Sequence, residues 1–300
     1  MAFAAFGSSA PAREPAPQRR GLIVLALLLP GILYLCVFFL VPLVYLLITS
    51  LQQLDPNTGQ YVAGFQLSNY TDSLGQYWPQ LLRAFLYALL ATVFALLVSY
   101  PLAYLIGVRM RRVPMLQALA VALVIAPFFI SFLLRTLAWK HIFADEGPVV
   151  AVLHGLSILG PSQYINGSPF AVVFGLTYNF IPFMTLPLFA SLERLDLRFL
   201  EAANDLYASP ARSFWAVTVP LSAPGIVSGS LLTFIPASGD YVNASSAFLG
   251  STQTAMIGNV IDQNFIVNPG PAAALSIALM VVILVIVGIY IRVSGTEDLV

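Results

Sequence analysis

The chain has 300 residues; 59% of them are hydrophobic, only 9% are charged, and the formal net charge is zero. Soluble domains carry about a quarter charged residues, so most of this surface must face lipid rather than water. The balanced charge provides no basic field for nucleic acid, and the single cysteine, Cys36, excludes an intrachain disulfide and a cysteine-based metal site.

Six stretches are long and apolar enough to cross a bilayer, which requires about 20 residues. The first is too long for a signal-peptide core and is expected to be a retained anchor; the Ala-, Pro-, Ser- and Arg-rich residues before it are expected to be disordered. The fifth is interrupted by Pro236, Ser238, Gly239 and Asp240. We therefore predict an all-α polytopic membrane protein with six transmembrane helices, at 22–49, 81–108, 116–137, 170–190, 224–241 and 272–291.

Basic residues predict the orientation of these helices. Ten of the 13 Lys and Arg residues fall before the first span, between the second and third, between the fourth and fifth, or after the sixth. By the positive-inside rule both termini and segment 191–223 are then cytoplasmic. Segments 51–80, 138–169 and 242–271 would lie outside.

The cytoplasmic segment 191–223 has the pattern of two short helices. Apolar side chains recur at helical spacing from Leu192 to Ala203 and predict an amphipathic helix at the membrane surface. Ser209 followed by Pro210 predicts the N-cap and first residue of a second helix. With a tight turn between them, the two helices would form a compact knob that faces water; an ordinary amphipathic connector is the alternative.

Two motifs stand in this loop: a Glu-Ala-Ala triplet that begins at Glu201 and a Val-x-Val-Pro string that ends at Pro220. They resemble the cytoplasmic loop of permease subunits of binding-protein-dependent ABC importers, whose coupling helices dock into a cleft of the ATP-binding subunit. Tyr207 stands where that family has a glycine, which would supply a turn that other residues adopt reluctantly. The resemblance implies an ATPase-coupling surface made by Glu201, Ala202, Ala203, Asp205, Tyr207, Val217, Val219 and Pro220.

A second informative run extends over residues 234–242 and is followed by Leu249-Gly250-Ser251 and Ile257-Gly258-Asn259. The proline and glycine in the run should bend or end the fifth helix just before Asp240. A carboxylate at membrane depth is costly unless it is paired or hydrated, so Asp240 is expected to face the bundle interior or an aqueous path. The alternative is that Asp240 lies at the outer interface and only caps the interrupted helix.

These strings closely resemble the same region of the spermidine/putrescine-type permeases within that importer family, with Ser251 in place of a family glycine. The resemblance implies a linear polyamine substrate that an extracytoplasmic binding protein delivers. Polyammonium chains favour carboxylates and aromatic faces, the latter worth about 0.5–2 kcal/mol each. The residues expected along the substrate path are Asp240, Tyr241, Tyr178 and Asn179; for the last two, interhelical packing is the alternative.

The resemblance also implies the rest of the machine: a non-enzymatic transport subunit in the bacterial inner membrane, with a second permease, two copies of an ATP-binding subunit and the binding protein. The chain lacks a phosphate loop that ends in Gly-Lys-Ser/Thr, so a separate subunit would hydrolyse ATP, and no cofactor is expected. The predicted organisation is a disordered tail over 1–21, a first transmembrane helix over 22–50, an extracytoplasmic segment over 51–80, a permease core over 81–291 that contains the coupling loop 191–223, and a cytoplasmic tail over 292–300.

Several alternatives concern cargo and mechanism. The same type of permease would also suit another small solute, such as a sugar, phosphate, iron or an amino-acid-like compound. An integral-membrane enzyme would need a facing set of reactive side chains that the spans lack, and a passive channel would need no knob. His141 and His154 do not have the spacing of a metal-ligand pair, so no metal is expected. Arg83 and Arg135 are expected to snorkel to the headgroups.

Overall fold

The computed structural model describes residues 20–160 and 163–293, and the two predicted tails fall almost entirely outside this range. The chain forms two compact units, with the boundary after Ile48. The first unit is an apolar helical segment that runs through α1 (Arg20–Leu35), the π-helical turn η1 (Cys36–Leu40) and into α2 (Val41–Ser50). The stretch Leu27–Ser50 has a mean hydropathy of 2.7, and none of its most apolar window is buried in the protein. Such a helix is stable in lipid.

The second unit begins with a short antiparallel hairpin, in which β1 (Gln53–Leu54) pairs with β2 (Tyr61–Val62). The long helix α3 (Ser68–Tyr104) follows, with a kink at Tyr77, and continues through η2 (Leu105–Arg109) and η3 (Met110–Arg112). This helix starts well before the predicted second span. The prediction missed its first turns because they are polar, and hydropathy does not detect a polar helix.

The third predicted span is not one helix. It is built from α4 (Pro114–Ile125), the 3₁₀ turn η4 (Ala126–Phe129) and α5 (Phe132–Ile142), and the helices on either side of the break are bent by 92°. Pro127 cannot donate a backbone hydrogen bond and crowds the preceding turn, so the α-helix gives way to a 3₁₀ turn there. Ile130 is then extended, with φ −104° and ψ 134°, and the chain changes direction. The prediction of a continuous helix over 116–137 was wrong.

The remaining elements follow the predicted order. The fourth span is α7 (Pro169–Glu193), the sixth is α13 (Pro269–Val293), and the fifth is α11 (Ala223–Ser238), which ends where its Pro and Gly predicted a break. The smaller elements are α6 (Pro148–Gly155), α8 (Arg198–Asp205), α9 (Pro210–Ser213), the π-helical turn η5 (Phe214–Thr218), α10 (Val219–Leu221) and α12 (Ile257–Asn264).

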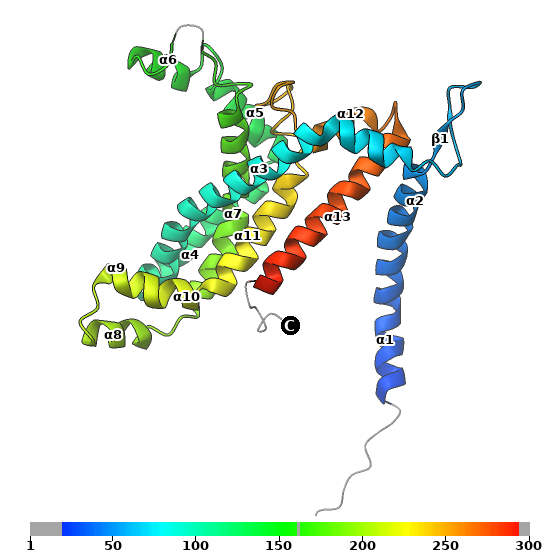
Figure 1. The fold of residues 1–300 in the computed structure, drawn as a ribbon. Helices are drawn as coiled ribbons and strands as arrows, with labels where there is room; N and C mark the ends of the chain where they lie inside the picture. Colours follow the sequence, from blue (N-terminus) through cyan, green and yellow to red (C-terminus); the bar gives the residue numbers. More distant parts are fainter. Residues whose placement is uncertain (1–19, 161–162, 294–300) are drawn as a thin grey trace, which may run out of the picture. The chain divides into compact units, whose positions relative to one another are not determined.

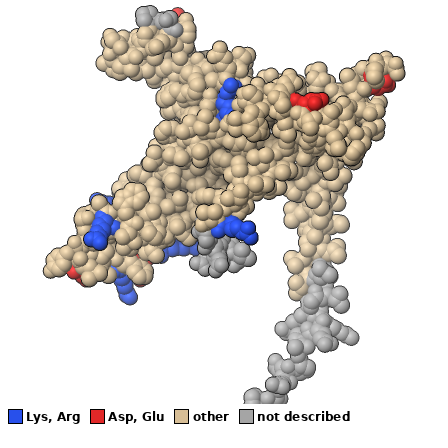
Figure 2. All heavy atoms as spheres, viewed as in Figure 1, with Lys and Arg blue, Asp and Glu red and all other residues tan. Residues whose placement is uncertain are grey.

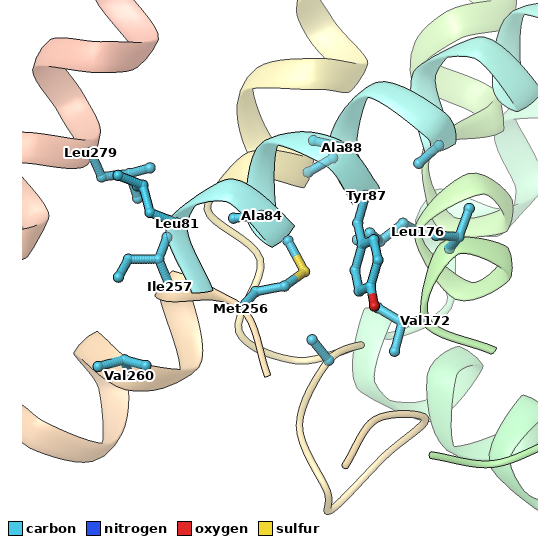
Figure 3. Packing of buried hydrophobic residues seen from close by; sticks show 14 of the residues in the cluster. Leu81, Ala84, Tyr87, Ala88, Val172, Leu176, Met256, Ile257, Val260 and Leu279 are labelled. Atoms are coloured by element: carbon cyan, nitrogen blue, oxygen red, sulfur yellow. The ribbon is translucent and has the colours of Figure 1, made fainter. Parts of the chain in front are cut away.

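The core of the second unit lies where α3 packs against α7, α11 and α13 (Figure 1). Small residues such as Ala84 and Ala88 on α3 let these helices approach closely, and Leu176 of α7 and Met256 fill the space beside them (Figure 3). Gly229 of α11 lies so close to α7 that an added Cβ would come within 2.8 Å of the Met184 sulfur. Close backbone approach of this kind is the expected packing mode of helices in lipid.

Among the described residues, four helices are long and apolar enough to cross a membrane, and the number rises to six if each bent pair forms one span. The bent pairs are α4 with α5, and Pro210–Leu221 with α11, the latter bent by 66°. The protein is therefore an all-α polytopic membrane protein, in agreement with the six-span layout.

Candidate functional site

The two short helices α8 and α9 form a knob (residues 198–213) at one end of the second unit (Figure 1). The predicted single helix from Leu192 to Ala203 was wrong, because Leu192 belongs to the last turn of α7 and is fully buried. The chain then turns, and Asp196 restarts helical structure: its Oδ1 accepts a bond from the Arg198 backbone N–H at 3.0 Å. The predicted cap of the second helix is confirmed, since Ser209 Oγ accepts from the Arg212 N–H at 3.3 Å and Pro210 is the first residue of α9.

Tyr207 makes the turn between α8 and α9 in the left-handed conformation, with φ +54°. The Ala208 N–H donates to the Ala203 carbonyl oxygen at 3.0 Å, which is the bond of a Schellman motif whose left-handed residue is usually glycine. The turn expected of a family glycine is therefore retained by a tyrosine. The Tyr207 side chain is 97% exposed.

The eight predicted coupling residues divide into an exposed group and an anchoring group. Glu201, Ala202, Asp205 and Tyr207 are exposed on α8 and the turn, whereas Ala203 is half-buried. Val217 and Val219 are half-buried as well, and Val219 packs against the cluster that contains Met184, Leu188 and Leu192; Pro220 is exposed beside them. The first motif thus presents a surface, and the second holds that surface to the bundle.

Arg111 is a further anchor, although its sequence context predicts only a positive charge on the cytoplasmic side. Its Nη2 donates to the Leu192 carbonyl oxygen at 2.7 Å and its Nη1 to that of Leu195 at 3.0 Å. The carbonyl groups at a helix C-terminus lack intrahelical partners, so a cation satisfies both the bonds and the helix dipole there. Aromatic packing adds to this: Phe214 meets the Tyr100 ring edge-on, with centroids 5.3 Å apart.

Asp240 follows the end of α11 and is only 7% exposed. Its Oδ2 accepts from the backbone N–H groups of Asn243 at 2.7 Å and Ala244 at 3.4 Å, and its Oδ1 accepts from Asn243 Nδ2 at 3.0 Å. The carboxylate therefore organises the turn over 240–244. These bonds lie in the turn that follows α11, and the role of Asp240 in an aqueous path stays a prediction.

A chain of oriented amides connects Asp240 to Asn179 on α7. Because Asn243 Nδ2 donates to the carboxylate, the Asn243 Oδ1 is the acceptor for Asn179 Nδ2, at 3.2 Å. Asn179 Nδ2 also donates to Thr136 Oγ1 of α5 at 3.0 Å. The Asn179 Oδ1 is buried and has no hydrogen-bond partner among the described residues. Asn243 and Thr136 join three elements and could not be singled out in sequence, because nothing local marks them.

The two predicted tyrosines lie apart from this cluster. The Tyr178 ring packs edge-on against Trp139, with centroids 5.2 Å apart, and stacks on Phe174. The Tyr241 ring is 54% exposed, and its backbone oxygen accepts from Asn259 Nδ2 at 2.6 Å. The structure thus joins Asp240 to Asn179 through one intermediate and brings neither tyrosine into that network.

The two outer arginines differ from the prediction in different ways. Arg83 Nη1 donates to the Ala255 carbonyl oxygen at 2.8 Å, so this side chain straps a loop. Arg135 is only 8% exposed, and its Nε and Nη1 have no hydrogen-bond partner in the described part of the chain. Its guanidinium lies 5.9 Å from the centre of the Phe132 ring. The prediction that Arg135 snorkels was wrong, because its side chain turns inward from α5. Within the described ranges, no three His, Cys, Asp or Glu side chains gather as metal ligands.

No family model matches the chain. Curated relatives do: the spermidine/putrescine transport system permease protein PotB of Haemophilus influenzae is 32% identical over 262 residues, which cover 86% of this chain and 90% of that protein. PotB of Escherichia coli is 36% identical over 233 residues, 77% of this chain and 83% of that protein. A PotB homolog of Mycoplasma genitalium is 28% identical and covers 78% of each.

Solved structures show the same fold at low sequence identity. A bacterial ABC transporter that imports the acidic polysaccharide alginate contains a chain with a TM-score of 0.63 and 18% identity, over 93% of this chain and 97% of that one. The MetNI methionine ABC transporter gives a TM-score of 0.51 at 18% identity, over 72% and 91%. The fold is that of ABC importer permeases, and the identity to the curated relatives shows that the chain belongs to the family of spermidine/putrescine transport system permease proteins.

Proposed function

We propose that this chain is a permease subunit of an ATP-driven importer for polyamines such as spermidine and putrescine. The observation that carries the proposal is the 36% identity to PotB of Escherichia coli over 83% of that protein. The chain would translocate substrate that an extracytoplasmic binding protein delivers, and a separate subunit would hydrolyse ATP.

The knob is the proposed contact with the ATP-binding subunit. Its exposed residues offer a carboxylate at Glu201, a small side chain at Ala202 that permits close approach, and an aromatic ring at Tyr207. The anchoring bonds of Arg111 tie the end of α7 to the junction after α3. Movement of a docked ATPase would therefore be transmitted to both central helices. In the proposed complex two ATP-binding subunits serve this chain and a second permease.

A charge reversal tests the coupling role. Glu201→Arg should abolish uptake and the ATPase activity stimulated by the binding protein, while insertion into the membrane persists. Glu193→Arg is the matched control, because Glu193 is an exposed carboxylate at the end of α7, outside the knob. Normal transport by Glu201→Arg would refute docking at this surface.

We also propose that the protein lies in the bacterial inner membrane with both termini in the cytoplasm. Charge supports this orientation: on the visible face of the second unit, most Lys and Arg side chains lie at the knob end and at the end of α13, whereas acidic side chains appear at both ends (Figure 2). Cysteine accessibility to an impermeant reagent tests it: a cysteine at exposed Asp205 should react only in inverted vesicles, and one at exposed Asp145 only in intact spheroplasts.

Asp240, Asn179, Tyr178 and Tyr241 remain the proposed substrate path, with roles adjusted to their contacts. The Asn179 Oδ1, which has no hydrogen-bond partner among the described residues, lies at the end of a chain of amides that begins at the Asp240 carboxylate. An ammonium N–H is a suitable donor for this oxygen. Tyr178 and Tyr241 would supply aromatic faces for cation–π contact. This assignment requires a conformation in which the cluster opens, since Asn179 is 1% exposed.

A different small solute is the second candidate, because the alginate and methionine transporters have the same fold. The test is uptake by cells that lack their own polyamine permeases and express this chain with its cognate ATP-binding subunit, second permease and binding protein. Labelled spermidine or putrescine should enter, and unlabelled polyamine should compete while sugars, phosphate and amino acids should not. Uptake no higher than in cells without the chain would refute the polyamine assignment.

A further inference from the structure

A cavity of about 480 Å³ opens beside the end of α11, between the 239–241 segment, α12 and α13. Its lining includes one carboxylate, Asp262, and two aromatic rings, those of Tyr241 and Phe265. Tyr241 and Phe265 are 54% and 45% exposed, so part of their surface is available to a ligand. None of the residues that line the cavity is basic.

The position of Asp262 follows from the way α12 is held. An added Cβ at Gly258 would come within 2.5 Å of the Asp240 backbone oxygen and 2.6 Å of that of Gly239, so only a glycine permits this contact. One residue further along, Asn259 Nδ2 donates to the Tyr241 backbone oxygen at 2.6 Å. The start of α12 is thus fixed against the segment that carries Tyr241. Asp262 stands one helical turn after Gly258, on the same face.

The electrostatics of the cavity favour a cation. The Asp262 side chain is exposed and has no hydrogen bond or ion pair within the described residues. The C-cap residue of α11, Gly239, and the first turn of α12, at Gly258, both line the cavity, so the partial charges of these two helix ends offset each other and Asp262 supplies the net negative charge. A carboxylate with flanking aromatic faces is the combination that recognises alkylammonium groups.

We infer that Asp262, Tyr241 and Phe265 form a binding site for an alkylammonium group at the mouth of the translocation path, which takes up one end of the substrate as the binding protein releases it. This inference rests on the proposed polyamine function. It adds a site that is separate from the buried network of Asp240 and Asn179, and it assigns a role to Asp262 and Phe265. The aminoethyl headgroup of a phospholipid has the same ammonium chemistry, and the experiment separates the two sources.

The experiment uses the complete transporter reconstituted in vesicles, with spermidine-loaded binding protein on the outer side. Asp262→Asn should lower the maximum uptake rate about threefold to tenfold at saturating binding protein, which matches the loss of one ion pair or cation–π contact. Asp262→Glu should restore most of the rate, and Phe265→Leu should lower it to a similar extent. Asp145→Asn, which removes an exposed carboxylate elsewhere in the protein, is the matched control and should behave as wild type.

The other outcomes overturn the inference. Equal rates for Asp262→Asn and Asp145→Asn would show that Asp262 binds nothing during transport. A raised half-saturating concentration of binding protein with an unchanged maximum rate would make Asp262 a docking contact. A defect that disappears in vesicles of phosphatidylglycerol without phosphatidylethanolamine would assign the cavity to lipid. Absence of spermidine uptake by the wild-type complex would refute the proposed function itself, which is a distinct result.

Discussion

The Arg111 guanidinium donates to the Leu192 carbonyl oxygen at 2.7 Å and thereby ties the junction after α3 to the last turn of α7. The same side chain reaches the Leu195 oxygen and, through Nε, the oxygen of Gly107 at 3.0 Å. Three carbonyl groups, from η2, the last turn of α7 and the bend after it, thus share one cation directly before the knob. The segment that leads into the knob is thus tied to the two central helices by hydrogen bonds from a charged donor, which are stronger than neutral ones.

Loss of this clamp should uncouple the knob from the bundle. Arg111→Met removes hydrogen bonds from a charged group, each worth about 1.5–3 kcal/mol when buried and less at this half-buried site. We expect uptake and stimulated ATPase activity to fall at least tenfold, with normal amounts of protein in the membrane. Arg112→Met is the control, since Arg112 is exposed. Equal activity of the two variants would show that the clamp does not contribute to coupling.

The left-handed Tyr207 makes a second prediction about the knob. A residue with a β-carbon is strained by about 1–2 kcal/mol in this conformation, whereas glycine is not. Tyr207→Gly should therefore increase protection of the α8 amides from hydrogen exchange relative to Tyr207→Ala. Both variants lack the ring, so any loss of ATPase contact is common to them. Greater protection in the alanine variant would show that φ at this position is not the source of strain.

Part of the knob and of its attachment to the bundle could be predicted from the sequence, and part could not. The knob, its Ser209 cap and the end of α11 were predicted because short local signals specify them: a hydroxyl before Pro210, or Pro236 followed by Gly239. The clamp of Arg111 on Leu192 was not predictable, because those residues are 81 positions apart and only packing brings them together.

The prediction of a continuous third span was wrong for a different reason. Hydropathy over 116–137 is continuous, and Pro127 is tolerated in many membrane helices, so the pattern did not distinguish a kink from the change of direction at Ile130. The hydrogen-bond partners of Asp240 could not be predicted either, because Asn243 looks like any other polar loop residue in the sequence.

We expect Asp240→Asn to destabilise the protein and to abolish uptake, whatever solute the transporter carries. The carboxylate accepts from two backbone N–H groups and from Asn243 Nδ2, and an amide in its place would turn an N–H₂ group toward one of these donors. An unsatisfied buried donor costs about 1–3 kcal/mol, so the melting temperature of the purified complex should fall. Loss of uptake alone therefore does not identify a polyamine path.

Asn243→Ala separates the structural role of Asp240 from a charge role. This variant keeps the carboxylate and its backbone bonds but removes the amide that links it to Asn179. If the link is structural, the melting temperature should fall as it does in Asp240→Asn. A normal melting temperature with lost spermidine uptake would instead show that the oriented amide chain acts on the substrate.

Arg135 provides a test in the opposite direction. Removal of a buried group whose donors lack partners should stabilise a protein, whereas removal of a satisfied donor should not. Arg135→Met should therefore raise the melting temperature of the detergent-purified complex, by an amount that corresponds to about 1–2 kcal/mol. Arg83→Met is the matched control: it deletes a guanidinium that donates to the Ala255 oxygen at 2.8 Å, and its melting temperature should fall. If Arg135→Met is less stable than wild type, the guanidinium must have an acceptor in the assembled complex, and a carboxylate on a partner subunit would then be sought by cross-linking from position 135.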